Sequence, residues 1–359
     1  MPNFKNYPYN LSVIDLDCTR VVDRVDLRDL KEQTILVTGA NGLIGSFVAD
    51  LCCFLNDTFS YNIKLYLTSY SEKENAKRIL HCVNREDVKY FSWDCSFPIE
   101  QENLPSKIDY TFFCSGYGQP SKFLKDTIKT ALINVVGPDS ILKYMSENNG
   151  GNFLFLSTSE VYGNPSTENI PTPENYEGNS NLENNRASYI ASKKLGEVIC
   201  YEYNKLSKMN VKCARVALSY GPGILKNDGR VLQDFIIKAA TFKKIKMLDE
   251  GDSIRHYIYI SDCVEILLNM TLHGEHFVYN VGGDTEPVSI FGLAQKVGNF
   301  FDAQVIPNKN KKSKESIKSA PSRVGLDMTR YRHEFPTYGQ NLTSLDKGIE
   351  NILRWLNLQ

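Results

Sequence analysis

The sequence contains no apolar run as long as the ~18 residues that a membrane-spanning helix requires. Its N-terminus also has no apolar core of the kind found in secretory signal peptides. Charge of neither sign predominates: 41 basic and 42 acidic residues give a net charge of −1, and no long basic stretch occurs. We therefore expect a cytoplasmic protein with no membrane and no nucleic-acid partner, in which a few placed arginines bind any anionic ligand.

The cysteines have neither the spacing of a zinc site nor that of a disulfide framework. They number nine, an odd count, and none forms a Cys-x-x-Cys pair. Several lie inside apolar segments, which is typical of reduced, buried thiols in a cytosolic protein. We therefore predict no metal site. The positions are Cys18, Cys52, Cys53, Cys82, Cys95, Cys114, Cys200, Cys213 and Cys263.

A glycine-rich turn follows the apolar segment Thr34–Thr38 and precedes a helical pattern. Gly39 permits a tight turn, Gly42 lets the backbone approach a pyrophosphate, and Gly45 allows helix and strand to pack closely. Phosphates then bind at the helix N-terminus, where free N–H groups and the dipole favour negative charge. The turn predicts a dinucleotide site, although alone it also fits a structural strand–turn–helix. The expected cofactor contacts are Gly39, Asn41, Gly42, Leu43, Ile44 and Gly45.

Strand and helix patterns alternate from residue 34 to residue 220. This alternation predicts an α/β fold, a Rossmann-type doubly wound parallel sheet with helices on both faces. Beyond Gly221 the elements become shorter, which indicates a smaller C-terminal α/β substrate lobe. The expected strands are Thr34–Thr38, Ile63–Ser69, Val88–Ser92, Tyr110–Cys114, Phe153–Ser157 and Val211–Val216; helices are expected at about 43–55, 72–82, 124–147, 187–206, 231–241, 289–301 and 343–356.

We divide the chain into three parts. Residues 1–33 form an N-terminal arm, 34–220 the dinucleotide-binding domain with the catalytic motif, and 221–359 predominantly the substrate lobe. The arm has a short amphipathic stretch near Val21–Leu30 and is expected to pack on the body. The lysine-rich stretch Lys309–Lys318 is expected to be a solvated loop.

The segment Tyr189-Ile-Ala-Ser-Lys193 lies about 150 residues after the glycine turn. On a helix, positions i and i+4 share a face, so the phenol and the ammonium can converge on one substrate. A phenol with a pKa near 10 is a poor base at neutral pH, but a neighbouring ammonium and a positive nicotinamide ring favour the phenolate. The pair predicts a general base that acts beside a nicotinamide.

Hydroxyl groups and a carboxylate follow the strand that ends near Leu156, in the run Ser157-Thr-Ser-Glu-Val-Tyr-Gly163. Catalytic side chains of open α/β sheets gather at the carboxyl ends of strands, so this run should border the cleft. Thr158 could hydrogen-bond a sugar hydroxyl, and Glu160 could act as a base or position the substrate. Ser159 lies between them and joins the catalytic candidates.

These motifs together resemble the extended short-chain dehydrogenase/reductases of the NAD-dependent epimerase/dehydratase family, over about residues 33–357. The branch that the chain resembles most is that of the UDP-glucuronate decarboxylases (UDP-xylose synthases). The glycine turn and the Tyr189/Lys193 pair are general to the superfamily. The narrower motifs are Ser157–Gly163, Arg186-Ala-Ser-Tyr189, Tyr220-Gly-Pro, Asn227-Asp-Gly-Arg-Val231, Arg255-His-Tyr-Ile-Tyr-Ile-Ser-Asp262 and Asn280-Val-Gly-Gly283.

The resemblance implies a lyase that uses NAD and modifies a nucleotide-sugar for polysaccharide biosynthesis. Tyr189 would take the proton of the sugar 4-hydroxyl while C4 gives hydride to NAD+, and Lys193 would hold the nicotinamide ribose. Thr158 would assist at the same hydroxyl, and Glu160 would contact the sugar near C5. The resulting 4-keto acid loses CO2 without a strong base, and the NADH returns its hydride.

The resemblance also assigns binding residues. Asp94 would recognise the adenine amino group, and Arg230 and Arg255 would lie near the nucleotide diphosphate, where an arginine fork suits phosphate oxygens. Arg323 falls near the arginine that supports decarboxylation. The remaining assignments are Cys114, Ser115 and Gly116 for the cofactor, and Tyr117, Glu160 and Arg186 for the substrate.

Three positions depart from the family pattern. The second strand ends Tyr66-Leu-Thr-Ser-Tyr-Ser-Glu72, without the acid that normally binds the adenosine ribose, and no arginine stands directly at its end, so NADP stays open beside the favoured NAD. The segment Cys114-Ser-Gly-Tyr-Gly-Gln-Pro120 replaces the small proline-containing loop that this branch has after the fourth strand, and its Tyr117 and Gln119 could change sugar specificity. Gly223 stands where a basic residue is usual, which removes one contact to an anion.

Several functions therefore stay open beside UDP-glucuronate decarboxylase. An NDP-hexose 4,6-dehydratase needs a base at C5, which Glu160 could supply, and an acid for the C6 hydroxyl. A 4-epimerase or C4 oxidase acting on a sugar of a surface polysaccharide would use the same redox pair. A non-catalytic dinucleotide-binding relative is the alternative outside the enzymes. The resemblance implies a homodimer that pairs the helices near 124–147 and 187–206.

Overall fold

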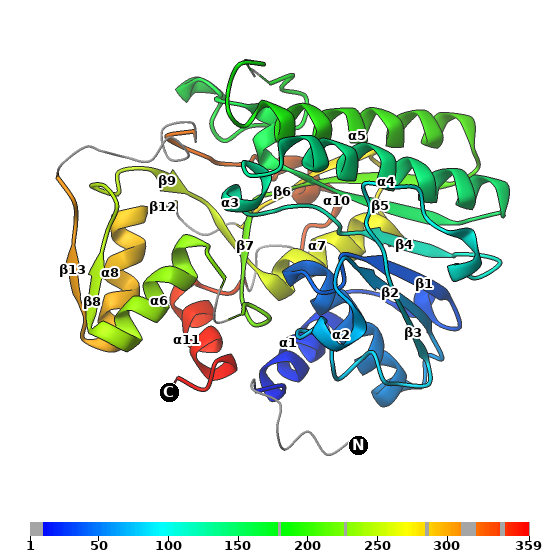
Figure 1. Ribbon diagram of the computed structural model, residues 1–359, viewed down its shortest axis with the longest axis horizontal. Helices are drawn as coiled ribbons and strands as arrows, with labels where there is room; N and C mark the ends of the chain where they lie inside the picture. The colour runs from blue at the N-terminus through cyan, green and yellow to red at the C-terminus, as the bar shows by residue number, and fades with distance from the viewer. Residues whose placement is uncertain are drawn as a thin grey trace.

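The computed structural model describes residues 10–178, 181–225, 228–283, 287–309, 321–337 and 342–358. Its centre is a seven-stranded parallel sheet in the order β11-β6-β5-β4-β1-β2-β3 (Figure 1). The predicted Rossmann-type fold is therefore confirmed. The strands are β1 (Thr34–Thr38), β2 (Lys64–Ser69), β3 (Val88–Ser92), β4 (Tyr110–Phe113), β5 (Asn152–Thr158), β6 (Asn210–Val216) and β11 (Val278–Val281).

Helices cover both faces of the sheet because successive side chains of each strand point to opposite faces. In β1, Ile35 and Val37 belong to a core shared with α2 and α7, whereas Leu36 belongs to a core shared with α4. Figure 1 shows α4 and α5 together on one face and α1, α2 and α7 on the other. These helices are α1 (Ser12–Val22), α2 (Leu43–Phe59), α4 (Thr127–Glu147), α5 (Ala187–Leu206) and α7 (Ile260–Leu272).

The strand order reverses at β1 and β4, which are neighbours in the sheet although two strands separate them in the sequence. At such a switch point the loops that leave the two strands diverge and open a crevice at their carboxyl ends. The glycine turn after β1 and the loop after β4 therefore meet at one edge of the sheet.

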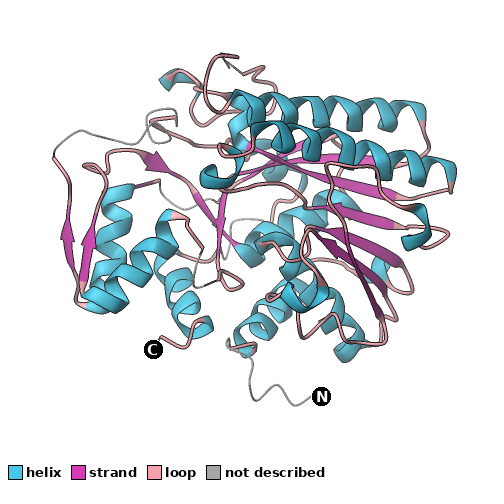
Figure 2. Ribbon diagram, viewed as in Figure 1, coloured by secondary structure: helices cyan, strands magenta, loops and turns pink. Residues whose placement is uncertain are grey.

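Small strands and helices form a lobe beside this edge (Figure 2). The chain does not stay in the lobe after residue 221, since α7 and β11 return to the main sheet. The lobe contains α6 (Val231–Phe242), β8 (Lys244–Lys246), β9 (Ile254–Arg255), β12 (Val288–Ser289), α8 (Ile290–Phe301), β13 (Gln304–Ile306) and α11 (Leu345–Trp355), and β7 (Leu218–Tyr220) and β10 (Tyr257–Tyr259) connect it to the sheet.

The helix expected at 72–82 is wrong. The segment has a short 3-10 turn at Lys73–Asn75 and continues in further turns. Its buried residues Ala76, Ile79 and Cys82 recur every third position, and backbone bonds from Ile79 to Ala76 and from Cys82 to Ile79 span three residues. A period of three fits 3-10 turns better than an α-helix. The lysine-rich stretch Lys309–Lys318 lies, apart from its first residue, outside the described residues.

The N-terminal arm packs through α1, a helix that the sequence analysis did not predict. Asp17 of α1 is buried and accepts a hydrogen bond from the Tyr259 hydroxyl at 2.6 Å. Arg20 forms an ion pair with Asp262 of α7 at 2.9 Å. Burial, opposed in part by the Tyr259 hydrogen bond and Arg20, raises the pKa of Asp17 to about 7.

None of the described helices is long and apolar enough to cross a bilayer. All nine cysteines are free thiols in this structure, eight of them buried and Cys114 half-buried. Their burial gives them the role of small apolar residues in the two cores.

The raised pKa of Asp17 makes the stability of the protein pH-dependent. Between about pH 4 and 7 the folded protein keeps a proton that the unfolded chain releases, so this contribution falls as the pH rises through that range. In Asp17→Asn the contribution is absent. We expect the Tm of the wild type, relative to Asp17→Asn, to fall from pH 5 to pH 7.5, by about 2–4 °C for each kcal/mol lost. Asp23→Asn, an exposed acid at the end of α1, is the control, and a constant difference would contradict the assignment.

Candidate active site

The glycine turn is fixed by its contact with the end of β4. Gly39 has φ +61°, and a Cβ there would lie 2.7 Å from the Cys114 carbonyl carbon and 2.8 Å from the Ser115 nitrogen. A Cβ at Gly42 or Gly45 would lie 2.9 or 2.6 Å from the Gly39 carbonyl oxygen. The close packing that requires Gly45 is thus with the turn itself rather than with the strand.

The N-terminus of α2 fits a phosphate group. The amide of Ser46 donates to the Gly42 carbonyl, and this bond begins the helical series. The amides of Leu43, Ile44 and Gly45 precede it and have no acceptor within the helix. Such amides, at the positive end of a 17-residue helix, are suited to bind a pyrophosphate.

The loop after β4 brings Lys193 to the same place. The amide of Ser115 donates to the Thr38 hydroxyl at 3.2 Å, and a Cβ on Gly116 would lie 3.4 Å from the Lys193 Nζ. Lys193 is buried in α5 and donates to the Leu156 carbonyl at 2.6 Å. Burial lowers the pKa of Lys193 to about 8. The residues predicted to meet a nicotinamide thus converge at the switch point, and Tyr117 beyond them is half-buried.

Tyr189 lies buried one helical turn before Lys193 and is stacked on an aromatic ring that the sequence analysis missed. The Phe123 ring, from α3 (Pro120–Phe123), is parallel to the Tyr189 ring within 4°, with 4.5 Å between the centroids. Burial and the nearby Glu160 raise the pKa of the Tyr189 phenol, whereas a hydrogen bond with Thr158 and the charge of Arg186 lower it. The phenol is therefore protonated at neutral pH, and its activation requires a further positive charge.

Glu160 and Arg186 form an ion pair beside this phenol, in which Arg186 is buried and Glu160 is half-buried. Arg186 donates through Nη1 to both carboxylate oxygens of Glu160, at 2.6 and 2.7 Å. The guanidinium also lies 5.4 Å from the centre of the Phe123 ring. The Thr158 hydroxyl accepts from the Glu160 amide at 3.3 Å, which fixes the turn containing Ser159. The structure thus brings together the catalytic candidates and Arg186.

The three other predicted arginines lie at different points around this group. Arg255, in β9, is near enough to Glu160 and Arg186 to interact with both charges, and burial lowers its pKa. The backbone of Arg323 forms an isolated parallel β-bridge with Ile254, but the Arg323 side chain is exposed. Arg230 is paired with Asp228 by two bonds of 3.0 and 2.8 Å.

Asp228 is a second residue that the sequence analysis did not single out. Its side chain is 2 % exposed and also accepts from Gln119 Nε2 at 2.9 Å and from Arg78 Nη2 at 3.3 Å. Arg78 in turn donates to the carbonyl oxygens of Asn41, at 2.8 Å, and of Gly223. Arg78 thus reaches Gly223, where the family places a basic residue. Asn227, the first residue of this motif, lies outside the described residues.

A cavity of about 550 Å³ opens beyond the glycine turn, at the ends of β2 and β3. Asp94 lies in it and accepts hydrogen bonds from Lys129 Nζ at 2.6 Å and from the Ser96 hydroxyl at 2.6 Å. Its place after β3, two strands from the phosphate-binding turn after β1, fits the adenosine half of a dinucleotide. The lining residues are Tyr70, Ser71, Glu72, Asn75, Ser92, Trp93 and Asp94.

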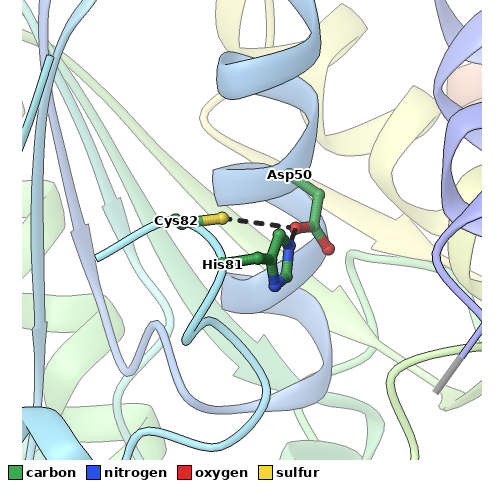
Figure 3. A group of neighbouring side chains, drawn as sticks. All are labelled: Asp50, His81 and Cys82. Atoms are coloured by element: carbon green, nitrogen blue, oxygen red, sulfur yellow. Dashed lines mark hydrogen bonds and ion pairs between the residues drawn. The ribbon is translucent and has the colours of Figure 1, made fainter. Parts of the chain in front are cut away.

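One group of possible metal ligands occurs in the described part of the chain, where the segment after β2 meets α2: Asp50, His81 and Cys82 (Figure 3). The Asp50 Oδ1 lies 2.5 Å from His81 Nε2 and 3.5 Å from Cys82 Sγ. Two ligand atoms on one tetrahedral zinc ion lie about 3.3 Å apart, so the shorter contact is a hydrogen bond. We assign these residues a structural role, in which Asp50 ties the irregular segment to α2.

Comparison with known proteins agrees with this geometry. The profile of the NAD dependent epimerase/dehydratase family matches residues 35–282. UDP-glucuronic acid decarboxylase 2 of Arabidopsis thaliana is 28% identical over 301 residues, which are 84% of this chain and 63% of the relative. UDP-glucuronic acid decarboxylase 1 of Xenopus tropicalis is 27% identical over 260 residues, 72% of this chain and 58% of the relative. The chain thus spans about three-fifths of the length of these relatives.

Solved structures share the fold. A UDP-glucuronic acid 4-epimerase from Bacillus cereus, in complex with UDP-glucuronic acid and NAD, superposes with a TM-score of 0.75 at 19% identity, over 90% of this chain and 99% of the other. An epimerase from Methanothermobacter thermautotrophicus gives a TM-score of 0.77 at 18% identity, over 97% and 96%. The chain therefore belongs to the NAD dependent epimerase/dehydratase family, whose members are extended short-chain dehydrogenase/reductases that use NAD.

Proposed function

We propose that the protein is a UDP-glucuronate decarboxylase, which oxidises its nucleotide-sugar at C4. The observation that carries the proposal is the charge around Glu160. Arg186 forms an ion pair with Glu160, and Arg255 lies near enough to interact with both charges, so two cations and one carboxylate leave a net charge of +1 in a half-buried site. A sugar carboxylate at C5 would balance this charge. The curated relatives with 28% and 27% identity are UDP-glucuronic acid decarboxylases, which supports the same substrate.

In this mechanism Tyr189 is the general base. The bound dinucleotide supplies the acceptor, and later the donor, of the hydride at C4. Tyr189 accepts the proton of the 4-hydroxyl, and Thr158, which already hydrogen-bonds the phenol, orients that hydroxyl. Lys193, held on the Leu156 carbonyl, lies beside Gly116 and places a positive charge near the cofactor ribose. Burial of the site excludes water from the 4-keto sugar.

The step that follows requires little from the protein. The 4-keto sugar is a β-keto acid, and loss of CO2 leaves an enolate that takes up a proton at C5. Glu160, with Ser159 beside it, positions the ring near C5, and Arg186 holds the carboxylate of Glu160 in place through both oxygens. Arg230 is placed at the lobe, where we assign it to the nucleotide diphosphate.

A 4,6-dehydratase is the second candidate, and Glu160 is the observation that favours it. That reaction needs a base at C5, where this carboxylate is expected, and an acid for the C6 hydroxyl. The two reactions differ in what the substrate carries at C5. A hydroxymethyl group gives no charge to balance Arg186 and Arg255, and we therefore rank decarboxylation first.

Product analysis decides between these reactions. Purified protein incubated with UDP-glucuronate and NAD+ is expected to release CO2 and to form UDP-xylose or the 4-keto pentose, detected by mass spectrometry. Turnover of only UDP-glucose, TDP-glucose or GDP-mannose would refute decarboxylation. Conversion of UDP-glucuronate to UDP-galacturonate without CO2 would identify an epimerase instead.

Tyr189→Phe tests the base. Removing the hydroxyl leaves the ring and its stacking on Phe123, so dinucleotide binding should persist while kcat falls about 10³-fold. Tyr203→Phe removes a phenol from the exposed end of the same helix and is the control. A kcat within tenfold of the wild type in Tyr189→Phe would rule out this role.

Arg255→Gln tests the charge argument. If Arg255 faces the sugar carboxylate, the variant should bind UDP-glucuronate at least tenfold more weakly and UDP-glucose less than twofold more weakly, measured by calorimetry. Equal losses for both ligands would place Arg255 at the diphosphate, as the family resemblance implies. Arg332→Gln, at the end of α10 (Thr329–Glu334), is the control.

We further propose that α4 and α5 pair with their counterparts in a homodimer. Four apolar side chains of these helices are exposed by 41% to 73%: Ile128, Leu132, Leu195 and Val198. Their spacing of three or four residues places them along one face of each helix. A surface of this kind on two neighbouring helices suits a four-helix bundle.

The paired variant Leu195→Glu/Val198→Glu should convert this dimer to a monomer, because four buried carboxylates would face one another across the axis. Light scattering after size-exclusion chromatography measures the mass. Leu206→Glu, at the end of α5 and 83% exposed, is the control. A dimeric double variant, or a monomeric wild type, would contradict the proposal.

A further inference from the structure

We infer that Gln119 and Asp228 latch a lid over the catalytic phenol, an inference that rests on the proposed role of Tyr189 as the general base. The lid is residues 118–125, which contain α3 and connect the loop after β4 to α4. Figure 1 shows α3 between the lobe on one side and α5 on the other. Gln119 is a positioning residue, since it acts on the phenol through Phe123.

The Phe123 ring covers the phenol of Tyr189. The two rings are parallel within 4°, with 4.5 Å between their centroids, and the two residues are 2% and 7% exposed. The guanidinium of Arg186 lies 5.4 Å from the centre of the Phe123 ring, so the lid also contacts the ion pair beside the phenol. Proton transfer requires the phenol oxygen to contact a sugar hydroxyl. Because so little of Tyr189 is exposed, a sugar can enter and leave only if part of this cover moves.

The lid is attached to the rest of the protein by few contacts. Phe123 is its only buried residue. The backbone hydrogen bonds that residues 122–125 donate end on residues 119–122, within the lid itself. From α4, the Thr130 hydroxyl donates to the Phe123 carbonyl at 3.4 Å. Segments with few buried contacts open locally at a small cost in free energy, so the lid is the part of the cover that moves.

The bond between Gln119 and Asp228 ties the lid to the lobe. The Gln119 Nε2 donates to Asp228 Oδ1 at 2.9 Å. The Asp228 carboxylate is 2% exposed and also accepts from the guanidinium of Arg230, at 3.0 and 2.8 Å, and from that of Arg78, at 3.3 Å. The amide of Gln119 is the neutral donor among these side chains, and its bond is therefore the one that opens first. The lid can thus leave without exposing Asp228 to the cost of a buried, unpaired charge.

Arg230 connects this latch to the substrate, because we assign its guanidinium to the nucleotide diphosphate. A bound diphosphate competes with Asp228 for the donors of Arg230. The carboxylate of Asp228 then depends more on its other donors, and its hydrogen bond with Gln119 becomes stronger. We therefore expect the lid to close more firmly when the diphosphate is bound, which keeps water away from the 4-keto sugar.

Hydrogen exchange measured by mass spectrometry tests the latch in the whole protein with NAD+ present. The amides of residues 122–125 are bonded within the lid and report its opening. Gln119→Ala removes the donor to Asp228, so these amides should exchange about fivefold faster than in the wild type, which corresponds to the loss of one neutral hydrogen bond. Saturating UDP is expected to occupy the diphosphate site without a sugar. It should slow exchange about threefold in the wild type and leave the rate in the variant unchanged.

Lys122→Ala is the matched control, since Lys122 is an exposed residue of the same lid. After correction for intrinsic rates, its exchange should equal that of the wild type. Exchange in β1 and β5 should be the same in all three proteins, which would show that the fold is retained.

Three outcomes would overturn the inference and leave the proposed function intact: an unchanged rate in Gln119→Ala, an equal increase in Lys122→Ala, or equal slowing by UDP in the wild type and Gln119→Ala. Calorimetry measures whether UDP binds. A protein that does not bind UDP would contradict the proposed function, and the comparison without UDP would still decide whether the latch exists.

Discussion

The approach of Gly39 to the backbone of Cys114 is the contact on which the site depends. Any side chain at this position would lie within 3 Å of the loop after β4, and φ is positive there. The contact joins the two strands at which the sheet order reverses. It therefore fixes the phosphate-binding end of α2 relative to the loop that carries Gly116, and thereby relative to Lys193. If these two strand ends were separated, the phosphate-binding end of α2 and Lys193 would no longer belong to one site.

The fold was largely predictable because its determinants are local. Buried strands such as Thr34–Thr38 are short apolar runs, and α5 has a regular helical pattern, so both were expected near their observed bounds. The segment 72–82 shows the limit. The number of its apolar residues is typical of a helix, but their spacing of three residues favours a series of turns. The side-chain bonds of Arg78 and His81 to residues far away in the sequence favour turns as well.

The candidate site was predictable only in part. Tyr189, Thr158 and Glu160 lie near the ends of a helix and a strand. The α/β topology determines where these ends lie, so the convergence of the three residues could be predicted. Phe123 and Asp228 could not be recognised, because their roles come from contacts between loops that lie far apart in the sequence. Nothing in the pattern of residues 120–123 indicates that a phenylalanine would cover the phenol. Glu72 lines the cavity, but its position in the sequence, three residues after the end of β2, did not indicate this.

The carboxylate of Asp228 has an energetic consequence of its own. It accepts from Arg230, Arg78 and Gln119, which come from the substrate lobe, the crossover after β2 and the loop after β4. Residues that share one partner contribute to stability and binding in a non-additive way. The effects of changing Arg78 and Arg230 are therefore not separable, although the first lies at the cofactor turn and the second at the lobe. The free energies of binding at the cofactor turn and at the lobe are therefore expected to be coupled through Asp228.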